Sequence, residues 1–178
     1  DVTNPSDTSQ SAPIFSAANA ASLVLWEFSD ADDVDMGYSH NQPVVDPYNG
    51  QAKQIVKMEN GQWAVIVGNG YNSDNGKAVL YILFITGGED GSWTLGTDYI
   101  KLVANAGPGN GLSTPMPFDS NGNGKVDVIY AGDIKGNLLK FDVSTTTPSS
   151  WNVAISGLPL FISGITKPII APPAVSLH

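Results

Sequence analysis

Residues 63–85 read WAVIVGNGYNSDNGKAVLYILFI, which is two runs of β-branched, aliphatic and aromatic residues with a polar segment between them. Such runs favour β-strands, and the Asn-Gly pairs at 69 and 75 tolerate the positive φ angles of tight turns. The one helix-like piece, residues 16–23, is weak. The sequence therefore predicts an all-β fold, with strands at 23–28, 63–68, 78–85, 127–132 and 137–143.

The chain repeats this pattern. Residues 63–93 and 126–151 each run through an apolar strand, a Gly-Asn or Gly-Asp pair, a turn glycine, a strand with a central aromatic and a tryptophan. Pro-led apolar segments lie at 42–46, 114–119 and 167–175, and their spacing of roughly 50 to 70 residues is typical of propeller blades. We therefore expect part of a β-propeller.

The expected domain organisation follows from these repeats. Residues 1–22 are predicted to be a flexible arm or linker, and residues 23–178 a partial β-propeller with about two complete four-stranded antiparallel blades plus flanking strands. Two blades cannot close a ring, and the chain begins at Asp1 without a signal peptide. We therefore expect a fragment of a longer protein, or a chain that pairs with another.

Composition narrows the classes of partner. The net charge is −9, and all 8 basic residues are lysines without a basic cluster. Nucleic acid is therefore not an expected partner, because phosphate neutralisation needs clustered cations. There is no cysteine, which excludes disulfides and thiolate metal sites. The sequence has no run of 18 apolar residues, so we expect no membrane span.

Residues 119–127, DSNGNGKVD, carry oxygen donors at alternate positions. Calcium takes six to eight oxygen ligands from carboxylates, amides, backbone carbonyls and water. Lys125 would contribute its backbone carbonyl, and Gly124 would be the pivot of the loop. The predicted metal ligands for Ca²⁺ are Asp119, Asn121, Asn123, Lys125 and Asp127.

This loop is not a complete EF-hand. The EF-hand pattern has a glutamate at position 12, where this chain has Tyr130 inside a predicted strand. Two formal negative charges favour weak binding, roughly micromolar to millimolar. The alternative is a turn in which the Asn and Asp side chains only bond to the backbone.

A second acidic cluster comprises Asp30, Asp32, Asp33 and Asp35. It is interpreted either as another cation site or, preferably, as a solvated turn whose carboxylates cap backbone N–H groups. Three lysines, Lys57, Lys77 and Lys135, are scattered and have no partner visible in the sequence.

The four tryptophans and one polar segment have alternative interpretations. Trp26, Trp63, Trp93 and Trp151 could form a sugar platform, but two of them follow the repeated hairpins, which favours packing within blades. The polar loop 69–76 is interpreted as solvent-exposed or, less favourably, as a contact for a partner.

Catalysis is not expected. His40 and His178 are the only histidines, and the spacing of Glu27, Glu59 and Glu89 does not indicate a hydrolase pair. Nucleophile-elbow, phosphate-loop, HExxH and dinucleotide-binding motifs do not occur in the sequence.

Residues 119–144, DSNGNGKVDVIYAGDIKGNLLKFDVS, resemble the signature of PilY1/PilC-like type IV pilus biogenesis and adhesion proteins. The likeness extends to residues 25–39, 63–73, 111–119 and 167–175. The resemblance implies a modified C-terminal β-propeller with one calcium loop, whose ligands map onto the five residues above. Asn123 departs from the aspartate that the family often has, which implies lower affinity.

The same resemblance implies a role outside the cell. Calcium occupancy in the family is linked to pilus extension and retraction, and therefore to twitching motility, adhesion and surface attachment. The implied partners are minor pilins and host or abiotic surfaces, and the implied location is the pilus tip or the outer membrane-associated bacterial surface. The Arg-Gly-Asp motif of some members cannot occur here, because the chain has no arginine.

Two other kinds of propeller remain as alternatives. One is an extracellular carbohydrate- or protein-binding propeller with FG-GAP-like calcium loops. Such proteins usually carry a loop in every blade, whereas residues 46–54 lack alternating donors. The other is a quinoprotein-type enzyme, which needs a closed ring and cationic contacts to its cofactor.

Overall fold

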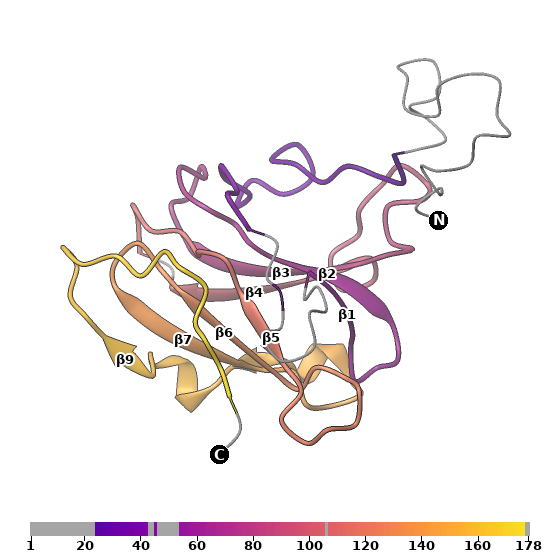
Figure 1. Ribbon diagram of the computed structural model, residues 1–178. Helices are drawn as coiled ribbons and strands as arrows, with labels where there is room; N and C mark the ends of the chain where they lie inside the picture. The colour runs from indigo at the N-terminus through magenta and orange to yellow at the C-terminus, as the bar shows by residue number, and fades with distance from the viewer. Residues whose placement is uncertain (1–23, 43–44, 46–53, 106, 177–178) are drawn as a thin grey trace, which may run out of the picture.

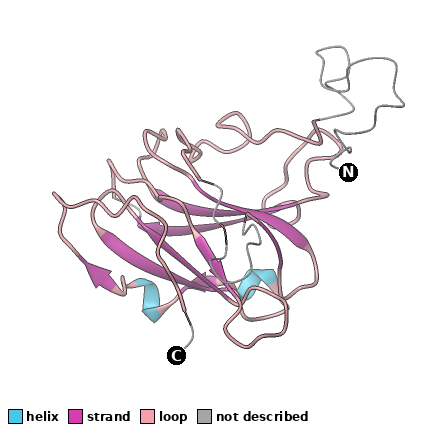
Figure 2. Ribbon diagram, in the orientation of Figure 1, coloured by secondary structure: helices cyan, strands magenta, loops and turns pink. Residues whose placement is uncertain are grey.

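The computed structural model describes residues 24–42, 45, 54–105 and 107–176. These residues form two antiparallel sheets (Figures 1 and 2). The first sheet has the order β1 (Ile55–Lys57), β2 (Trp63–Gly68), β3 (Ala78–Phe84) and β4 (Tyr99–Asn105). The second has β5 (Met116–Phe118), β6 (Val128–Gly132), β7 (Asn137–Asp142) and β8 (Asn152–Val153), and β9 (Phe161–Ile162) also pairs with β7.

β1 to β4 and β5 to β8 each form a meander in which a strand pairs with the next along the chain, so the prediction of two antiparallel blades is confirmed. The predicted strands at 63–68, 78–85, 127–132 and 137–143 correspond to β2, β3, β6 and β7 within one residue at each end. The hairpin turns after β2 and β6 contain glycines with positive φ, Gly70 and Gly76 in the first and Gly136 in the second.

Some strand predictions are wrong. Residues 24–28 contain no strand, and neither does the described part of the Pro-led segment 167–175. The segment 114–119 does contain β5, but most of 42–46 lies outside the described residues, and the first sheet begins with β1 instead. The predicted arm, residues 1–22, and the helix-like piece at 16–23 also lie outside the described residues.

The hydrophobic core lies between the two sheets. Alternate residues of β3, including Leu80 and Ile82, face Ile129 and Phe141 of the second sheet, and all four are buried. The other residues of β3, such as Tyr81, face away from the second sheet into a separate apolar cluster. All seven residues of β3 are therefore buried, which explains its continuous apolar run.

The two sheets differ in what covers their outer faces. Residues 24–41, here the covering segment, cross the outer face of the first sheet (Figure 1). Trp26 and Phe28 pack there with Trp93. On the second sheet, the side chains of Phe161 and Ile162 in β9 are more than half exposed. The first blade is thus covered on both faces by the described chain.

Three of the four tryptophans pack against the blades rather than form an exposed sugar platform. Trp26 and Trp93 meet edge to face at 5.0 Å between ring centroids, and Trp151 is buried in the core between the sheets. Trp63, at the start of β2, is 54% exposed.

The outermost strand of the second sheet is split. β8 pairs with the last two residues of β7, β9 pairs with its first two, and the 3₁₀ turn η3 (Ile155–Gly157) lies between them. The other 3₁₀ turn, η2 (Pro148–Ser150), precedes β8. Ile155 and Ser156 both have a φ of 56°, so the chain changes direction sharply between the two short strands.

Candidate metal centre

The predicted calcium loop connects β5 to β6. Phe118 pairs with Val128 across the two strands, so residues 119–127, here the β5–β6 loop, close a hairpin (Figure 1). Gly122 and Gly124 have φ angles of 77° and 82°, which other residues rarely adopt. The glycines therefore let the loop curl back over its own first residue.

The Asp119 carboxylate organises this curl. Its Oδ1 accepts hydrogen bonds from the backbone N–H groups of Gly122 at 2.7 Å and Asn123 at 3.2 Å. Its Oδ2 accepts another from Gly124 at 2.7 Å. Three successive N–H groups thus converge on one carboxylate, which the loop wraps.

The other predicted side-chain donors accept bonds inside the same loop. Asn121 Oδ1 accepts from the backbone N–H of Asn123 at 3.0 Å, and Asn123 Oδ1 accepts from that of Lys125 at 2.8 Å. Asp127, only 3% exposed, accepts from the N–H and Oγ of Ser120 at 3.0 to 3.2 Å. All four predicted side-chain donors thus accept hydrogen bonds within the β5–β6 loop.

The donor set suits a hard divalent cation. The hydrogen bonds above are those expected for the alternative interpretation, a turn in which the Asn and Asp side chains bond to the backbone. A carboxylate has about four lone-pair positions and an amide oxygen two, however, so these oxygens can still accept further bonds. Within the described ranges, no three His, Cys, Asp or Glu side chains gather in a metal-binding group. A calcium ion would therefore depend on two carboxylates together with amide and backbone oxygens, as expected for weak binding.

The sequence interpretation missed one residue at this loop, Glu59. Glu59 lies in the turn between β1 and β2, is 9% exposed, and its Oε1 accepts a hydrogen bond from Asn123 Nδ2 at 2.7 Å. Its Oε2 lies 3.5 Å from Lys125 Nζ. The contact joins residues 64 positions apart in the chain, so no local pattern could have indicated it.

The second acidic cluster has a different environment. Lys101 Nζ lies 2.6 Å from both Asp33 Oδ1 and Asp35 Oδ2, and Lys77 Nζ lies 3.2 Å from Asp35 Oδ2. Asn75 also donates to Asp35, at 2.6 Å. These four residues, Asp33, Asp35, Lys77 and Lys101, are here the acid–lysine cluster.

Several predictions are corrected here. Asp33 and Asp35 are 9% and 1% exposed, so the interpretation as a solvated turn is wrong for them. It holds for exposed Asp32, whose carboxylate accepts from the N–H of Ser29 at 2.8 Å. Lys77 has a partner after all. The second-cation hypothesis loses its basis, because the ammonium of Lys101 already lies between the two buried carboxylates.

The pKa shifts in the acid–lysine cluster follow from burial and hydrogen bonding. Burial alone would raise the pKa of Asp33 and of Asp35, but the hydrogen bonds from Lys101 and from the other neighbours of each carboxylate together outweigh it, and both pKa values fall below the ordinary 3.8. Burial would lower the pKa of Lys101, but its bonds to the two carboxylates raise it. Burial, and then Asp33, raise the pKa of Tyr99, whose hydroxyl donates to Asp33 at 2.8 Å.

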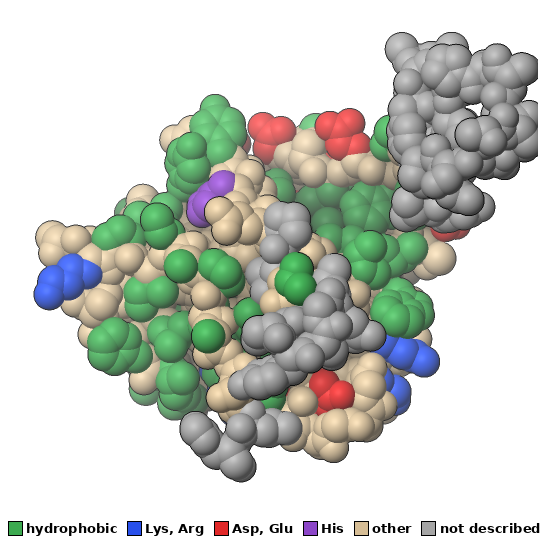
Figure 3. All heavy atoms as spheres, in the orientation of Figure 1, with side chains coloured by type: hydrophobic (Ala, Val, Ile, Leu, Met, Phe, Trp, Pro, Cys, Tyr) green, Lys and Arg blue, Asp and Glu red, His purple; other side chains and the backbone are tan. Residues whose placement is uncertain are grey.

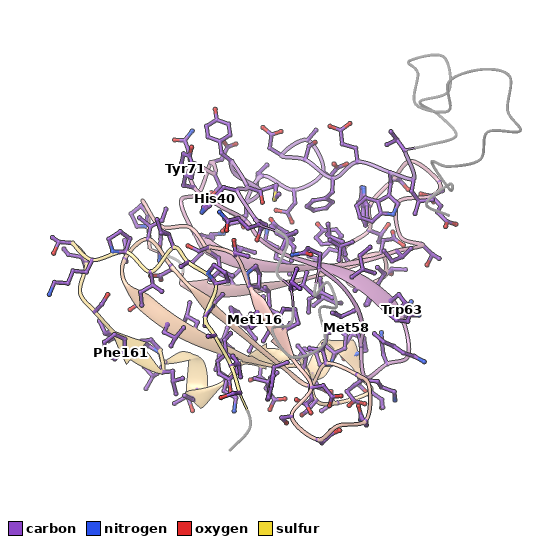
Figure 4. The ribbon with its side chains drawn as sticks, in the orientation of Figure 1. His40, Met58, Trp63, Tyr71, Met116 and Phe161 are labelled. Carbon is purple, nitrogen blue, oxygen red and sulfur yellow. The ribbon has the colours of Figure 1, made fainter. Side chains whose placement is uncertain are left out.

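The polar loop 69–76 is only partly exposed. Asn69 is fully buried, and its Oδ1 accepts from the N–H groups of Val79 and Leu112 at 3.1 and 2.9 Å. Tyr71 is 49% exposed and lies against His40 and Tyr38 (Figure 4). The interpretation of this loop as plainly solvent-exposed is therefore wrong at Asn69.

The repeat gives Asn69 an equivalent in the second blade. Asp133 follows β6 as Asn69 follows β2, and it is fully buried. It accepts from the N–H and Nδ2 of Asn137 at 2.8 and 2.7 Å, and from Asn110 Nδ2 at 2.9 Å. The Gly-Asn and Gly-Asp pairs of the repeat thus place a buried hydrogen-bonding residue at the same point of both hairpins.

Comparison with known proteins places this chain in a family. Residues 12–160 match the PilY1 beta-propeller domain. The type IV pilus biogenesis factor PilY1 of Pseudomonas aeruginosa (strain UCBPP-PA14) is 34% identical over 179 residues, which cover 87% of this chain and 14% of that protein. A PilY1 homolog of Xylella fastidiosa (strain Temecula1) is 37% identical over 186 residues, covering 95% of this chain and 11% of the homolog.

A solved structure agrees. The crystal structure of the Pseudomonas aeruginosa PilY1 C-terminal domain superimposes with a TM-score of 0.69 at 32% identity, over 88% of this chain and 33% of that one. The chain therefore spans about a seventh of the first of these curated relatives and a third of the solved domain.

These findings decide between the alternatives. They favour the PilY1 interpretation over a receptor with FG-GAP-like loops, and the relatives are named as biogenesis factors rather than as enzymes. Within the part of the chain that the structure describes, no helix has the length and apolarity to cross a bilayer. The repeats, the two antiparallel blades, the family match and the solved relative agree, and the chain belongs to the PilY1 β-propeller domain family.

Proposed function

We propose that this chain is a calcium-binding β-propeller segment of a type IV pilus-associated adhesin or assembly factor. The observation that carries the proposal is the β5–β6 loop, in which three successive N–H groups converge on the Asp119 carboxylate. Asn121, Asn123 and Asp127 follow at alternate positions of that loop. Membership of the PilY1 family supports the pilus-related part.

The residues of the loop would hold the ion as follows. The side-chain oxygens of Asp119, Asn121, Asn123 and Asp127 and the carbonyl of Lys125 are the proposed ligands. A bound calcium ion would supply two positive charges beside two carboxylates that otherwise repel each other. Because the loop closes the β5–β6 hairpin, its residues would transmit this stabilisation to the edge of the second sheet.

Calorimetric titration with calcium and with magnesium tests the binding step. The wild-type chain is expected to bind calcium with an affinity of roughly micromolar to millimolar, and magnesium more weakly, because magnesium demands near-ideal octahedral geometry. Asp119→Ala is expected to abolish the calcium signal.

Asp90→Ala is a matched control, since Asp90 also caps a turn, through Ser92, on the exposed part of the first blade. It should bind calcium as the wild type does. A wild-type chain that gives no calcium signal under conditions where it is folded would contradict the proposal.

We further propose that the parent protein acts outside the cell, at the pilus tip or on the outer membrane-associated surface. Its partners would be minor pilins and a host or abiotic surface, and its occupancy by calcium would support pilus extension, twitching motility and attachment. The relatives named as type IV pilus biogenesis factors support this assignment.

Asp127→Ala in the full-length parent tests the role in the pilus. This variant is expected to reduce surface piliation and twitching at unchanged protein level, and Asp90→Ala is expected to leave both unchanged. Normal piliation and twitching in Asp127→Ala would defeat the link between calcium and the pilus, while leaving calcium binding to be judged by titration.

A further inference from the structure

We infer that Glu59, a residue of the first blade, is a positioning residue for the calcium loop of the second, so that calcium affinity depends on the contact between the blades. The inference rests on the proposed calcium binding and adds a residue that is not among the five proposed ligands. It is carried by what Glu59 contacts, by its burial and by its place in the fold.

Glu59 orients the amide of Asn123. Only the Nδ2 end of an amide can donate to a carboxylate, and Asn123 Nδ2 donates to Glu59 Oε1 at 2.7 Å. This bond fixes the opposite end, Oδ1, which belongs to the proposed ligand set and accepts from the N–H of Lys125. Without Glu59, the exposed Asn123 side chain could rotate and present its NH₂ group to the ion.

Glu59 also compensates the charge of Lys125. The ammonium of Lys125 lies 3.5 Å from Glu59 Oε2, so its positive charge has a partner outside the loop. A lysine within a proposed calcium loop opposes a divalent cation by Coulomb repulsion. Removing Glu59 would therefore weaken binding a second way, by leaving this charge unpaired.

The backbone holds Glu59 in place. Met58, directly before it, is fully buried and forms a parallel bridge with Val126 in the β5–β6 loop. The N–H of Val126 donates to the carbonyl of Lys57 at 2.8 Å. Figures 1 and 4 show the loop beside the turn that contains Met58. Figure 3 shows both acidic and lysine side chains on that side of the molecule.

This arrangement makes calcium binding and blade contact reciprocal. If the position of Glu59 raises calcium affinity, calcium must strengthen the contact between the two sheets by the same factor. The first blade, which contributes none of the five proposed ligands, thereby takes part in the calcium site.

Calcium titration and urea unfolding of four proteins test the inference: the wild type, Glu59→Ala, Glu59→Gln and Glu89→Ala. Glu59→Ala is expected to weaken calcium affinity about tenfold, as loss of a residue that orients a metal ligand does. Glu59→Gln should lie between it and the wild type, because it keeps an acceptor for Asn123 but leaves Lys125 unpaired. Glu89→Ala removes the same charge from an exposed turn of the first blade and should bind like the wild type.

The outcomes separate the inference from the proposed function. Wild-type affinity in Glu59→Ala, even with lower stability in chelator, shows a merely structural role and overturns the inference while calcium binding stands. If Glu59→Ala does not fold, unchanged affinity in Glu59→Gln overturns it instead. A folded wild type that binds no calcium overturns both.

Discussion

Two groups of carboxylates in this protein, each considered from the sequence as a cation site, have different hydrogen-bond partners. In the acid–lysine cluster, Asp33 and Asp35 are buried and bonded to the ammonium groups of Lys101 and Lys77. In the β5–β6 loop, Asp119 and Asp127 are bonded to backbone N–H groups and a hydroxyl. Lysine ammonium groups offset the negative charge of the first pair. The donors bonded to the second pair are neutral and leave its negative charge uncompensated.

Carboxylates that lie close together in the sequence therefore do not by themselves make a cation site. Backbone N–H groups orient a carboxylate without cancelling its charge, so an ion can still gain from approaching it. An ammonium group cancels the charge and occupies the space. The lysine within the β5–β6 loop, Lys125, is instead paired with Glu59 from the other blade.

The largest effect is expected from removing the central lysine of the cluster. Lys101→Ala should destabilise the chain by about 3 kcal/mol, because it leaves two buried carboxylates facing each other without their main partner. Urea unfolding measures the loss. Lys167→Ala, at an exposed position, should be nearly neutral, and a neutral Lys101→Ala would show that water already solvates the cluster.

The next effect belongs to the β5–β6 loop. Calcium at about 100 times its dissociation constant should add about 2.7 kcal/mol to the unfolding free energy of the wild type. Asp119→Ala should remove this gain, whereas Lys101→Ala should retain it on a lower baseline. Thermal melts with calcium and with chelator measure both, and equal gains in all three proteins would contradict the assignment of the site.

Acid should weaken the acid–lysine cluster in a defined direction. The pKa values of Asp33 and Asp35 are lowered in the folded state, so their stabilisation is complete above the unfolded value near 3.8 and is lost as the pH falls through the folded values. The loss should be smaller than that of Lys101→Ala, because the lowered pKa values resist protonation of the folded state and Lys101 stays in place. Urea unfolding in chelator between pH 6 and 3 measures it. Asp33→Asn should make the unfolding free energy depend less on pH in this range. An unchanged pH dependence in that variant would show that other groups cause it.

The smallest effect is expected from the outer lysine of the cluster. Lys77 has a 29% exposed side chain and contacts Asp35 alone of the two carboxylates. Since Lys101 remains, Lys77→Ala should cost about 0.5 kcal/mol in urea unfolding. A loss as large as that of Lys101→Ala would mean that the two lysines stabilise the carboxylates equally, and would contradict the central role of Lys101.

Much of the fold was predictable because its signals are local. The four apolar runs that became β2, β3, β6 and β7 lie next to Asn, Asp and Gly residues, and turn chemistry depends on a few adjacent positions. The run at 24–28 misled because periodicity does not tell a strand from an apolar segment that lies across a sheet. Trp26 and Phe28 are apolar because they cover the first blade, not because they pair in it.

The donors of the candidate site were predictable for the same reason, since all five lie within nine residues. Its surroundings were not. Glu59 reaches Asn123 from 64 positions away, and Lys77 reaches Asp35 from 42. Such contacts depend on how one sheet packs on the other and on how the covering segment crosses the first sheet, which no short motif contains.

The divided outer strand of the second blade has a consequence for association between chains. A long open strand edge offers a row of unpaired N–H and C=O groups that can recruit a strand from another molecule. Here β8 and β9 have two residues each, separated by η3 with its left-handed backbone, and β1 and β5 have three each. Among the described strands that lie at a sheet edge, β4 is thus the longest, with seven residues. The described part of the chain therefore offers few long strand edges at which a second copy could pair.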